Sequence, residues 1–466
     1  MLRYIALILS FFTTLSFDLV TVGKSEAVGV NRYETYQTIE SFGTSSAWWA
    51  QTIDDEATAR RIARLLYDPE TGLGLTTYRY NIGGGSADDP AERIDSASRK
   101  TESFLVFDPD SGESRYDFTR DANAVRMMKL AVEYGAKNVV LFCNSPHYSM
   151  TVSGHASGGL EANVSNLPKE NYQAFVDYVL TIADHFLAEG IPVTEISPIN
   201  EPQWSWGGDW VGQEGCHYTA EECAELLELF AVTMSSRGCP YKLACPESGQ
   251  LTEEYDAYID EAFSREAVSS AADHIHAHSY WMDRNVEGKA AFAAKMAEKY
   301  PDKKFVMSEW CELPLRLDST TIDSGIYMAK TMIEDLNVLN AVSWQSWTAV
   351  NGDGLMELDG ETLTMYKRYY AFRQFSAFIT PGMTRCDALV SSPLLQSTAF
   401  LDDEKTVIVL VNDSETAVNA RLLGCYRTQQ TYITDAASDC ALIYSGAKSS
   451  RINVPGMSIM TLVLGK

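Results

Sequence analysis

The chain is poor in positive charge. It contains 37 lysine and arginine residues against 63 aspartate and glutamate residues, so its formal net charge is −26. Nucleic-acid binding depends on clustered basic side chains that neutralise phosphates, and this composition argues against a nucleic-acid partner. Like-charge repulsion also disfavours a polyanionic polysaccharide, so a neutral polymer is the simpler expectation. Solubility alone is the other explanation of the acidity.

Two common binding patterns are also missing. The nine cysteines lack zinc-ligand spacing, and their odd number leaves at least one thiol unpaired within the chain. Cys425 with Cys440 and Cys239 with Cys245 are candidate disulfides, although spacing alone does not give the connectivity. The glycine run 83–85 is not followed by Lys-Ser/Thr, so it is not a nucleotide phosphate loop. We therefore expect no cofactor.

Long hydrophobic runs are absent beyond the N-terminus. Residues 4–17, after Arg3, are mostly apolar, and small residues around Ala27 offer a cleavage point. This pattern predicts a secretory signal over residues 1–27, with an N-terminal membrane anchor as the alternative. No later segment is long and apolar enough to span a bilayer. We therefore expect a secreted or cell-surface protein.

The chain does have a regular alternation of strand and helix patterns. Apolar residues recur at helical spacing over 121–134 and 171–188, and Thr219 with Glu222 forms a capping-box pattern before another helix. Eight β-prone runs alternate with such helices, at 39–48, 76–83, 137–144, 192–200, 241–247, 274–281, 304–310 and 341–349. They predict a (β/α)8 TIM barrel over residues 39–381 and do not suit an open doubly wound sheet.

The sequence pattern changes after Pro381. Short β-prone runs separated by turn signals follow, at 397–401, 406–411, 418–423, 430–434 and 458–464. They predict a small β-sandwich over residues 382–466. Residues 28–38 also look extended, so we expect this N-terminal strand to join the sandwich.

Two glutamates end apolar, β-prone runs. Glu201 lies in Ile-Ser-Pro-Ile-Asn-Glu-Pro and Glu309 in Lys-Phe-Val-Met-Ser-Glu-Trp, at the ends of the fourth and seventh runs. Active sites of (β/α)8 barrels form at the carboxyl ends of the strands. A solvated loop or a surface ion pair would explain either glutamate alone, but the pair suits cleavage of a glycosidic bond.

Other polar and aromatic residues cluster near these strand ends. His274, His276 and His278 alternate, which puts all three on one face of the sixth run. A metal site is conceivable there, but the sequence shows no further ligand cluster, so we expect satisfied imidazoles, no metal, and His278 in contact with substrate. Tryptophans 204, 206 and 210 follow Glu201 and form either a substrate wall or loop packing.

Several segments together resemble glycoside hydrolase family 30, a family of barrel enzymes with catalytic glutamates on strands four and seven. They are Glu40-Ser-Phe-Gly-Thr-Ser, Tyr78-Arg-Tyr-Asn-Ile-Gly-Gly, Asn144-Ser-Pro, Asn200-Glu-Pro, His278-Ser-Tyr, Ser308-Glu-Trp, Ser346-Trp and Val454-Pro-Gly-Met-Ser-Ile-Met-Thr. The resemblance covers nearly everything after residue 27, and the order and spacing of the segments make it specific.

The resemblance implies a retaining hydrolase in which Glu309 is the nucleophile and Glu201 the acid/base. It implies that Arg79 lies beneath Glu309 and keeps that carboxylate ionised, while Glu201 has a raised pKa. The two carboxyl groups should then lie about 5–5.5 Å apart. Tyr280 would bond to Glu309, and Trp347 would form the floor under the sugar. The expected substrate-binding residues are Arg79, Asn144, Tyr148, Asn200, Trp204, His278, Tyr280 and Trp347.

Three segments are most similar to the endo-β-1,6-galactanases of that family: Gly43-Thr-Ser-Ser-Ala-Trp-Trp-Ala, Asn200-Glu-Pro-Gln-Trp-Ser-Trp and Gln213-Glu-Gly-Cys-His. This likeness implies cleavage of β-1,6-galactan side chains. One departure is His147-Tyr148, where such enzymes have tryptophans. A β-1,6-glucanase, a β-glucosidase or a xylanase is the alternative within the family, and a non-catalytic sugar-binding protein is the alternative outside it.

Overall fold

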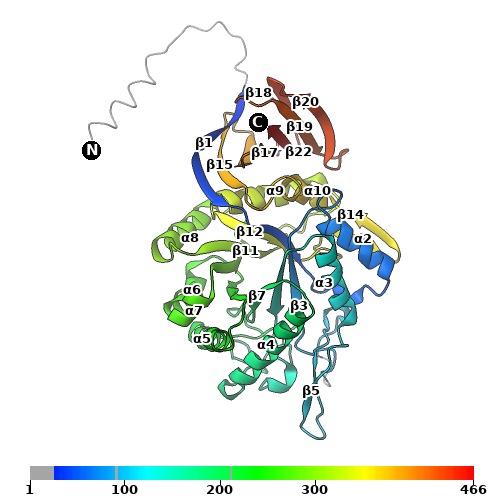
Figure 1. The fold of residues 1–466 in the computed structure, drawn as a ribbon, viewed down its shortest axis with the longest axis vertical. Helices are drawn as coiled ribbons and strands as arrows, with labels where there is room; N and C mark the ends of the chain where they lie inside the picture. Colours follow the sequence, from blue (N-terminus) through cyan, green and yellow to red (C-terminus); the bar gives the residue numbers. More distant parts are fainter. Residues whose placement is uncertain (1–25, 90–92, 210–211) are drawn as a thin grey trace, which may run out of the picture.

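The protein consists of a helix-covered barrel and a β-rich part beside it (Figure 1). The structure is a computed structural model that describes residues 26–89, 93–209 and 212–466. The barrel strands are β2 (Ser41–Ser45), β3 (Thr77–Ile82), β6 (Asn138–Cys143), β7 (Val193–Ser197), β8 (Lys242–Leu243), β9 (Cys245–Ser248), β10 (His274–His278), β11 (Lys304–Trp310) and β12 (Ala341–Ser346).

These strands form a parallel sheet in the order β8-β7-β6-β3-β2-β12-β11-β10-β9. Only Ala244 separates β8 from β9, so the two are halves of one interrupted strand that closes the ring. Seven of the eight predicted runs contain one barrel strand each, and the run 241–247 contains β8 and all of β9 except its last residue, which confirms the predicted (β/α)8 fold.

Helices surround the barrel (Figure 1). They are α2 (Glu56–Tyr67), α3 (Ala122–Tyr134), α4 (Tyr172–Ala188), α5 (Ala220–Arg237), α6 (Glu253–Ser264), α7 (Glu266–Ala271), α8 (Val286–Lys299), α9 (Ile322–Asn337) and α10 (Lys367–Ser376). Short 3-10 turns are η1 (Ala50–Thr52), η2 (Ala97–Arg99), η3 (Tyr148–Met150) and η4 (Lys169–Asn171). The capping box of α5 is present as predicted, because Thr219 and Glu222 each bond to the other's backbone N–H. Among the described residues, no helix has both the length and the apolar character needed to cross a bilayer.

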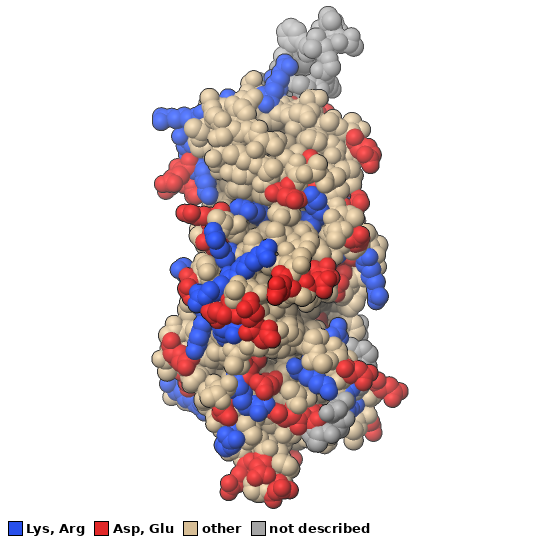
Figure 2. Space-filling view, turned by 90° about the vertical axis from the view of Figure 1, so that its right-hand side faces the viewer, with Lys and Arg blue, Asp and Glu red and all other residues tan. Residues whose placement is uncertain are grey.

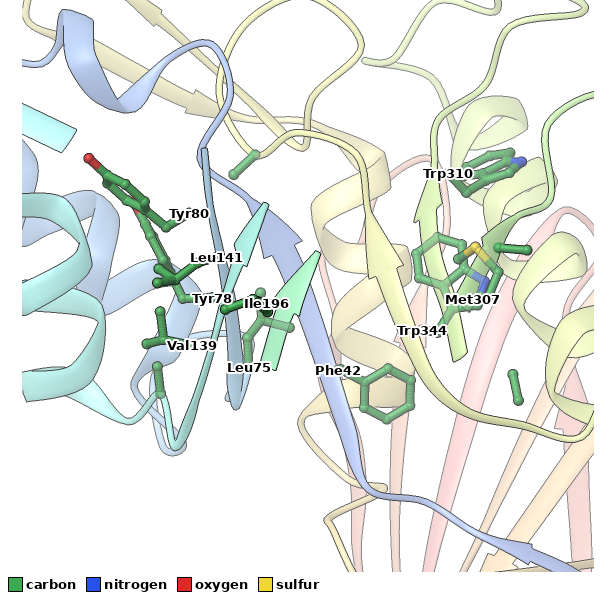
Figure 3. Close-up of a cluster of buried hydrophobic side chains, with 14 of the residues drawn as sticks. Phe42, Leu75, Tyr78, Tyr80, Val139, Leu141, Ile196, Met307, Trp310 and Trp344 are labelled. Atoms are coloured by element: carbon green, nitrogen blue, oxygen red, sulfur yellow. The ribbon is translucent and has the colours of Figure 1, made fainter. Parts of the chain in front are cut away.

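The alternation of strand side chains explains how the barrel holds polar groups inside. On β3, Tyr78 and Tyr80 point outward into the layer between strands and helices (Figure 3), and both are fully buried. Because successive side chains alternate, Arg79 and Asn81 point into the barrel. The large aromatic side chains of Tyr78 and Tyr80 therefore pack in the layer of the helices, while the polar side chains of β3 lie inside the barrel.

A β-bulge near the end of β11 determines the direction of the Glu309 side chain. The register between β10 and β11 shifts after Ala277 of β10. The register between β11 and β12 shifts after Met307 of β11. A bulge reorients the side chains that follow it. As a result Glu309 faces the barrel interior, whereas Trp310 packs against Trp344, with ring centroids 5.7 Å apart (Figure 3).

The β-rich part is one curled sheet in the order β20-β19-β22-β17-β16-β15-β1-β18-β21. Its strands are β1 (Glu26–Thr38), β15 (Thr384–Val390), β16 (Leu395–Leu401), β17 (Lys405–Asn412), β18 (Val418–Leu422), β19 (Thr428–Thr434), β20 (Ala441–Ala447), β21 (Arg451–Val454) and β22 (Ser458–Gly465). All five predicted C-terminal runs are strands, and β1 pairs with β15 and β18 as expected of the N-terminal segment. The hydrogen bonding is continuous, so the predicted sandwich is a single sheet that curls around its own core.

The central strand β17 is buried on both faces of the sheet. On β17, Ile408 and Leu410 point into the sheet's own core, whereas Val407, Val409 and Val411 join the core of the barrel part. Helices α9 and α10 lie between the barrel and the sheet (Figure 1). Two hairpins absent from the sequence prediction complete the fold: β4 (Leu105–Phe107) with β5 (Ser114–Tyr116), and β13 (Met356–Asp359) with β14 (Thr362–Met365).

The candidate disulfides are wrong, because all nine cysteines are free. Cys239 and Cys245 are separated by an extended segment that includes β8, and a strand rises about 3.3 Å per residue, which carries the thiols too far apart to bridge. Cys425 precedes β19 and Cys440 follows it, so these two lie at opposite ends of a strand.

A buried ion cluster between α8 and α9 gives a prediction for stability. Lys289 is fully buried, and its Nζ lies 3.0 Å from Glu334 Oε2 and 2.8 Å from Asp335 Oδ1. Lys289→Ala removes the cation paired with Asp335 and one of the two paired with Glu334, which keeps Arg284, and should lower the free energy of unfolding by about 3–5 kcal/mol. Guanidinium unfolding measures the loss. Lys299→Ala on the same helix removes only a surface ion pair, to Asp260, and should cost about 1 kcal/mol or less; equal losses would contradict the prediction.

Candidate active site

Both predicted glutamates line one pocket at the carboxyl ends of the barrel strands. The pocket has a volume of about 530 Å³. Its aromatic lining consists of Trp48, Trp204, Trp206, Tyr280, Trp281 and Trp347, and its polar lining includes Arg99, Asn200, Ser205, Gln213 and Asp353. Aromatic faces pack against the C–H faces of pyranose rings while polar groups bind hydroxyls, so the lining suits a sugar.

Backbone geometry holds Glu201 at the pocket wall. The residue has φ of +45°, and its N–H donates to the carbonyl of Glu247 at 3.0 Å. The carbonyl of Glu201 accepts from the indole N–H of Trp206 at 2.8 Å. A positive φ outside glycine requires such support from its surroundings, and proteins retain it most often at functional sites.

Glu309 is held by two donors, one on β3 and one just after the end of β10. The phenol of Tyr280 donates to Glu309 Oε1 at 2.9 Å, and the guanidinium of Arg79 bonds to Glu309 Oε2. Arg79 also donates to Asn200 Oδ1 at 3.0 Å and stacks on the ring of Phe142. These contacts agree with the expected placement of Arg79 beneath Glu309 and of Tyr280 beside it.

The two glutamates meet around a histidine. One carboxylate oxygen of Glu201, one of Glu309 and a ring nitrogen of His278 all lie within 4.8 Å of one another. His278 Nδ1 donates to Glu201 Oε1 at 3.0 Å and lies 3.6 Å from Glu309 Oε1. His278 is fully buried beneath the carboxylates and does not line the pocket, so the expected substrate contact of His278 is corrected to a contact with the two acids.

Glu247, at the end of the fifth barrel strand, completes this cluster. It is fully buried and accepts hydrogen bonds from His278 Nε2 at 3.1 Å, Ser308 Oγ at 2.5 Å and Ser197 Oγ at 3.0 Å. Sequence reasoning missed it, although the run 241–247 ends in this carboxylate just as the fourth run leads to Glu201. That shared pattern was the signal that could have identified it.

Charges in the cluster shift several pKa values. Burial lowers the pKa of an imidazole, but the surrounding carboxylates of Glu309, Glu201 and Glu247 raise the pKa of His278 to about 10. Burial raises the pKa of Glu247, yet Arg79 and the histidines outweigh burial and hold it well below the usual range. Burial also raises the pKa of Glu309 above its ordinary value, although the positive charges of His278 and Arg79 act in the opposite direction. The three carboxyl groups thus face two cations, Arg79 and His278.

Aromatic residues form two sides of the pocket. Trp347 packs edge-on against Trp48 with ring centroids 5.1 Å apart, and Trp204 packs in the same way against Trp281 at 5.5 Å. Trp204 and Trp347 therefore line the pocket as expected, whereas Trp48 and Trp281 were not among the predicted site residues. Residue 210, the third tryptophan of the loop, lies outside the described residues.

Besides His278, three predicted substrate-binding residues, Arg79, Asn144 and Tyr148, are not part of the pocket lining, and Arg79 instead binds Glu309 and Asn200 inside the barrel. Asn144 bonds at 3.2 Å to the side chains of Asn81 and Asn200, so it supports Asn200 from below. Tyr148 packs against Phe107 and His147 instead. The η3 turn carries Tyr148 toward the β4–β5 hairpin, which the sequence did not predict.

Comparisons with known proteins agree with this site. A family model described as O-glycosyl hydrolase family 30 matches residues 25–356. The chain is 27% identical to an endo-β-1,6-galactanase from Hypocrea rufa over 399 residues, which cover 80% of this chain and 78% of that protein. It is 23% identical to the glucuronoxylanase XynC of Bacillus subtilis (strain 168), with 73% of this chain and 77% of that protein covered.

A solved structure of a conserved exported protein from Bacteroides fragilis has a similar fold. The TM-score is 0.84 at 24% identity, and the match covers 94% of this chain and 100% of that one. The family model spans most of the chain, from before β1 through the last barrel strand, and includes both glutamates. The chain therefore belongs to O-glycosyl hydrolase family 30 and is a glycoside hydrolase.

Proposed function

We propose that Glu309 is the nucleophile and Glu201 the acid/base of a retaining hydrolase that cleaves β-1,6-galactosidic linkages. The observation that carries the assignment is the approach of the two carboxyl groups, whose nearest ligand atoms lie within 4.8 Å of each other. Retaining glycosidases hold their carboxyl groups about 5–5.5 Å apart, whereas inverting enzymes need about 6.5–9.5 Å to fit a water molecule.

The reaction then has two steps. Glu309 attacks the anomeric carbon while Glu201 gives its proton to the glycosidic oxygen, so the C–O bond breaks and a glycosyl-enzyme ester forms. Glu201, now ionised, takes a proton from water, whose oxygen attacks the anomeric carbon and releases Glu309. Arg79 and Tyr280 position Glu309 for the attack, because each fixes one of its carboxylate oxygens.

The stereochemical outcome tests the pairing of the carboxyl groups. Two displacements at one carbon restore the original configuration, so the β-anomer of the product should form first. Proton NMR of the anomeric signal, recorded before mutarotation, distinguishes the two outcomes. An α-anomer at the earliest time points would contradict the assignment.

The proposed substrate is a β-1,6-galactan side chain. Its support is the 27% identity to an endo-β-1,6-galactanase and the aromatic walls of the pocket. A neutral polymer also suits the acidic chain, and on the face drawn in Figure 2 basic side chains are interspersed with acidic ones. The matched glucuronoxylanase makes xylan the second candidate, and Arg99 in the pocket lining gives an acidic sugar substituent a cation to bind.

A panel of polysaccharides tests the specificity. β-1,6-Galactan, β-1,6-glucan, β-1,4-xylan and glucuronoxylan are incubated with the enzyme, and products are sized by chromatography. We expect release of galacto-oligosaccharides from β-1,6-galactan, and the Glu309→Gln variant gives the background. Preferential cleavage of glucan or xylan would overturn the galactan proposal. Binding without cleavage by the unaltered enzyme would identify a sugar-binding protein.

Gly249 allows a test of how closely Glu201 must be positioned. A Cβ at Gly249 would lie 2.8 Å from Glu201 Oε1 and 2.5 Å from the amide nitrogen of Gln203. Gly249→Ala should therefore displace the acid/base and lower kcat/KM about 10²-fold without unfolding the protein. Gly446→Ala is the matched control, since its Cβ meets only Tyr444 on the edge strand β20. Unchanged kcat/KM for Gly249→Ala would contradict the close positioning.

We also propose that the enzyme acts outside the cytoplasm. The apolar N-terminal run predicted to be a signal supports this, as does the similarity to an exported protein. Fractionation of cells that express the full chain, followed by N-terminal sequencing, should find the protein in the medium or at the cell surface. Retention in the cytoplasm would contradict the proposal.

A further inference from the structure

A second polar pocket lies at the opposite end of the barrel from the active site. Its volume is about 180 Å³. It is lined by the first residues of several strands, including Ser41, Thr77, Asn138, Lys242 and His274. These positions mark the amino ends of the strands, whereas catalysis uses the carboxyl ends. The pocket is therefore separate from the site described above.

Two histidines and a glutamate converge beside this pocket. His274 Nδ1 and His276 Nε2 each lie 3.2 Å from Glu195 Oε1, and one ligand atom of each residue lies within 4.8 Å of the other two. Two ligands held about 2.05 Å from a tetrahedral zinc ion lie about 3.3 Å apart. The contacts to Glu195 thus already have the spacing that a shared ion would impose.

The surroundings orient His274 as a metal site requires. The other ring nitrogen of His274, Nε2, lies 2.9 Å from Glu40 Oε2, and histidine ligands of metals usually donate their second N–H to a carboxylate in this way. Glu40 in turn binds Lys304, which fixes its position. The second nitrogen of His276, Nδ1, has no hydrogen-bond partner, and Glu247 Oε1 lies 3.8 Å from it.

The pocket also contains an unpartnered acceptor. The amide oxygen of Gln345 has no hydrogen-bond partner, although the side chain is 3% exposed and lines the pocket. An unpaired buried polar atom costs free energy unless water or a ligand satisfies it. Water bound to a cation at His274 would be a suitable donor, and the pocket has room for it.

We propose that His274, His276 and Glu195 bind a divalent transition metal ion of the zinc class, with water in the remaining position. Two imidazoles and one carboxylate suit zinc, cobalt or nickel, whereas calcium and magnesium prefer oxygen ligands. The ion would join β7 to β10 at the base of the barrel. Lys242 is paired with Asp273 at 3.1 Å, so its charge at the pocket rim is largely balanced.

Zinc titration of chelator-treated, full-length protein by calorimetry tests the site. The Glu309→Gln variant is used as the background, because Glu201, His278 and Glu309 form the other described cluster of potential ligands. We expect one equivalent of zinc to bind in Glu309→Gln, and His274→Gln in that background to weaken binding by at least about 100-fold. Glu40→Gln, which removes only the carboxylate behind His274, should weaken it by about 10–100-fold.

The visible absorption of bound cobalt reports on the metal site without any substitution of its ligands, so it does not depend on whether the ligand variants fold. Co²⁺ bound by two imidazoles and a carboxylate should give visible d–d absorption, and zinc should displace it. A metal-free network of ion pairs predicts no such absorption. The proposal is overturned if micromolar zinc and cobalt do not bind to Glu309→Gln, or if binding is unchanged in a folded His274→Gln variant.

Discussion

Glu309→Gln is expected to lower kcat on β-1,6-galactan by about 10⁴-fold or more. The amide keeps the shape of the side chain and can still bond to Tyr280 and Arg79, but it cannot form the glycosyl-enzyme ester. Reducing-sugar release measures the loss. Glu298→Gln, at an exposed position on α8, is the matched control and should leave kcat unchanged.

The identity of the nucleophile can be checked a second way. In Glu309→Ala the space left by the carboxylate admits azide. With an aryl β-glycoside that has a good leaving group as substrate, azide should attack the anomeric carbon in one displacement and give the α-glycosyl azide. Inversion of the product in this variant, against retention in the unaltered enzyme, assigns the nucleophile directly. Near-normal hydrolysis by Glu309→Gln would overturn the assignment.

The barrel could be predicted from sequence because its signals are local. Each strand is an apolar run, and each helix has apolar residues at its own period, so the eight repeats are visible without tertiary information. The run 304–310 matches β11 at both ends. The curling of the C-terminal sheet was not visible, because it depends on the exact pairing of strands that lie far apart in the sequence, such as β1 with β15, between which the whole barrel lies.

The site was predicted less completely, because part of it depends on contacts between residues far apart in the sequence. Glu201 and Glu309 could be found because each follows an apolar run and belongs to a family segment. The bulge that turns Glu309 inward, and the contacts of Glu247 with His278, arise only when distant strands are placed side by side. The sequence showed three histidines on one face but gave no sign that Glu195 lies opposite two of them.

Glu201→Gln should show a different pattern from Glu309→Gln, because it removes a proton donor. We expect kcat/KM on galactan to fall by about 10²–10⁴-fold, since the sugar leaving group needs protonation. An aryl β-1,6-galactobioside with a dinitrophenol leaving group needs no proton, so its first step should proceed at nearly the normal rate. Steady-state and burst kinetics on the two substrates measure the difference.

The accumulating intermediate then identifies the second role of Glu201. Without a base to activate water, the glycosyl-enzyme on Glu309 should persist and be visible by mass spectrometry of the intact protein. Azide needs no base and should restore turnover in Glu201→Ala, with retained β configuration because it attacks the ester formed on Glu309. An equal loss of rate on both substrates, without accumulation or azide rescue, would assign the proton transfer to another residue, and His278, which donates to Glu201 at 3.0 Å, would be the first to test.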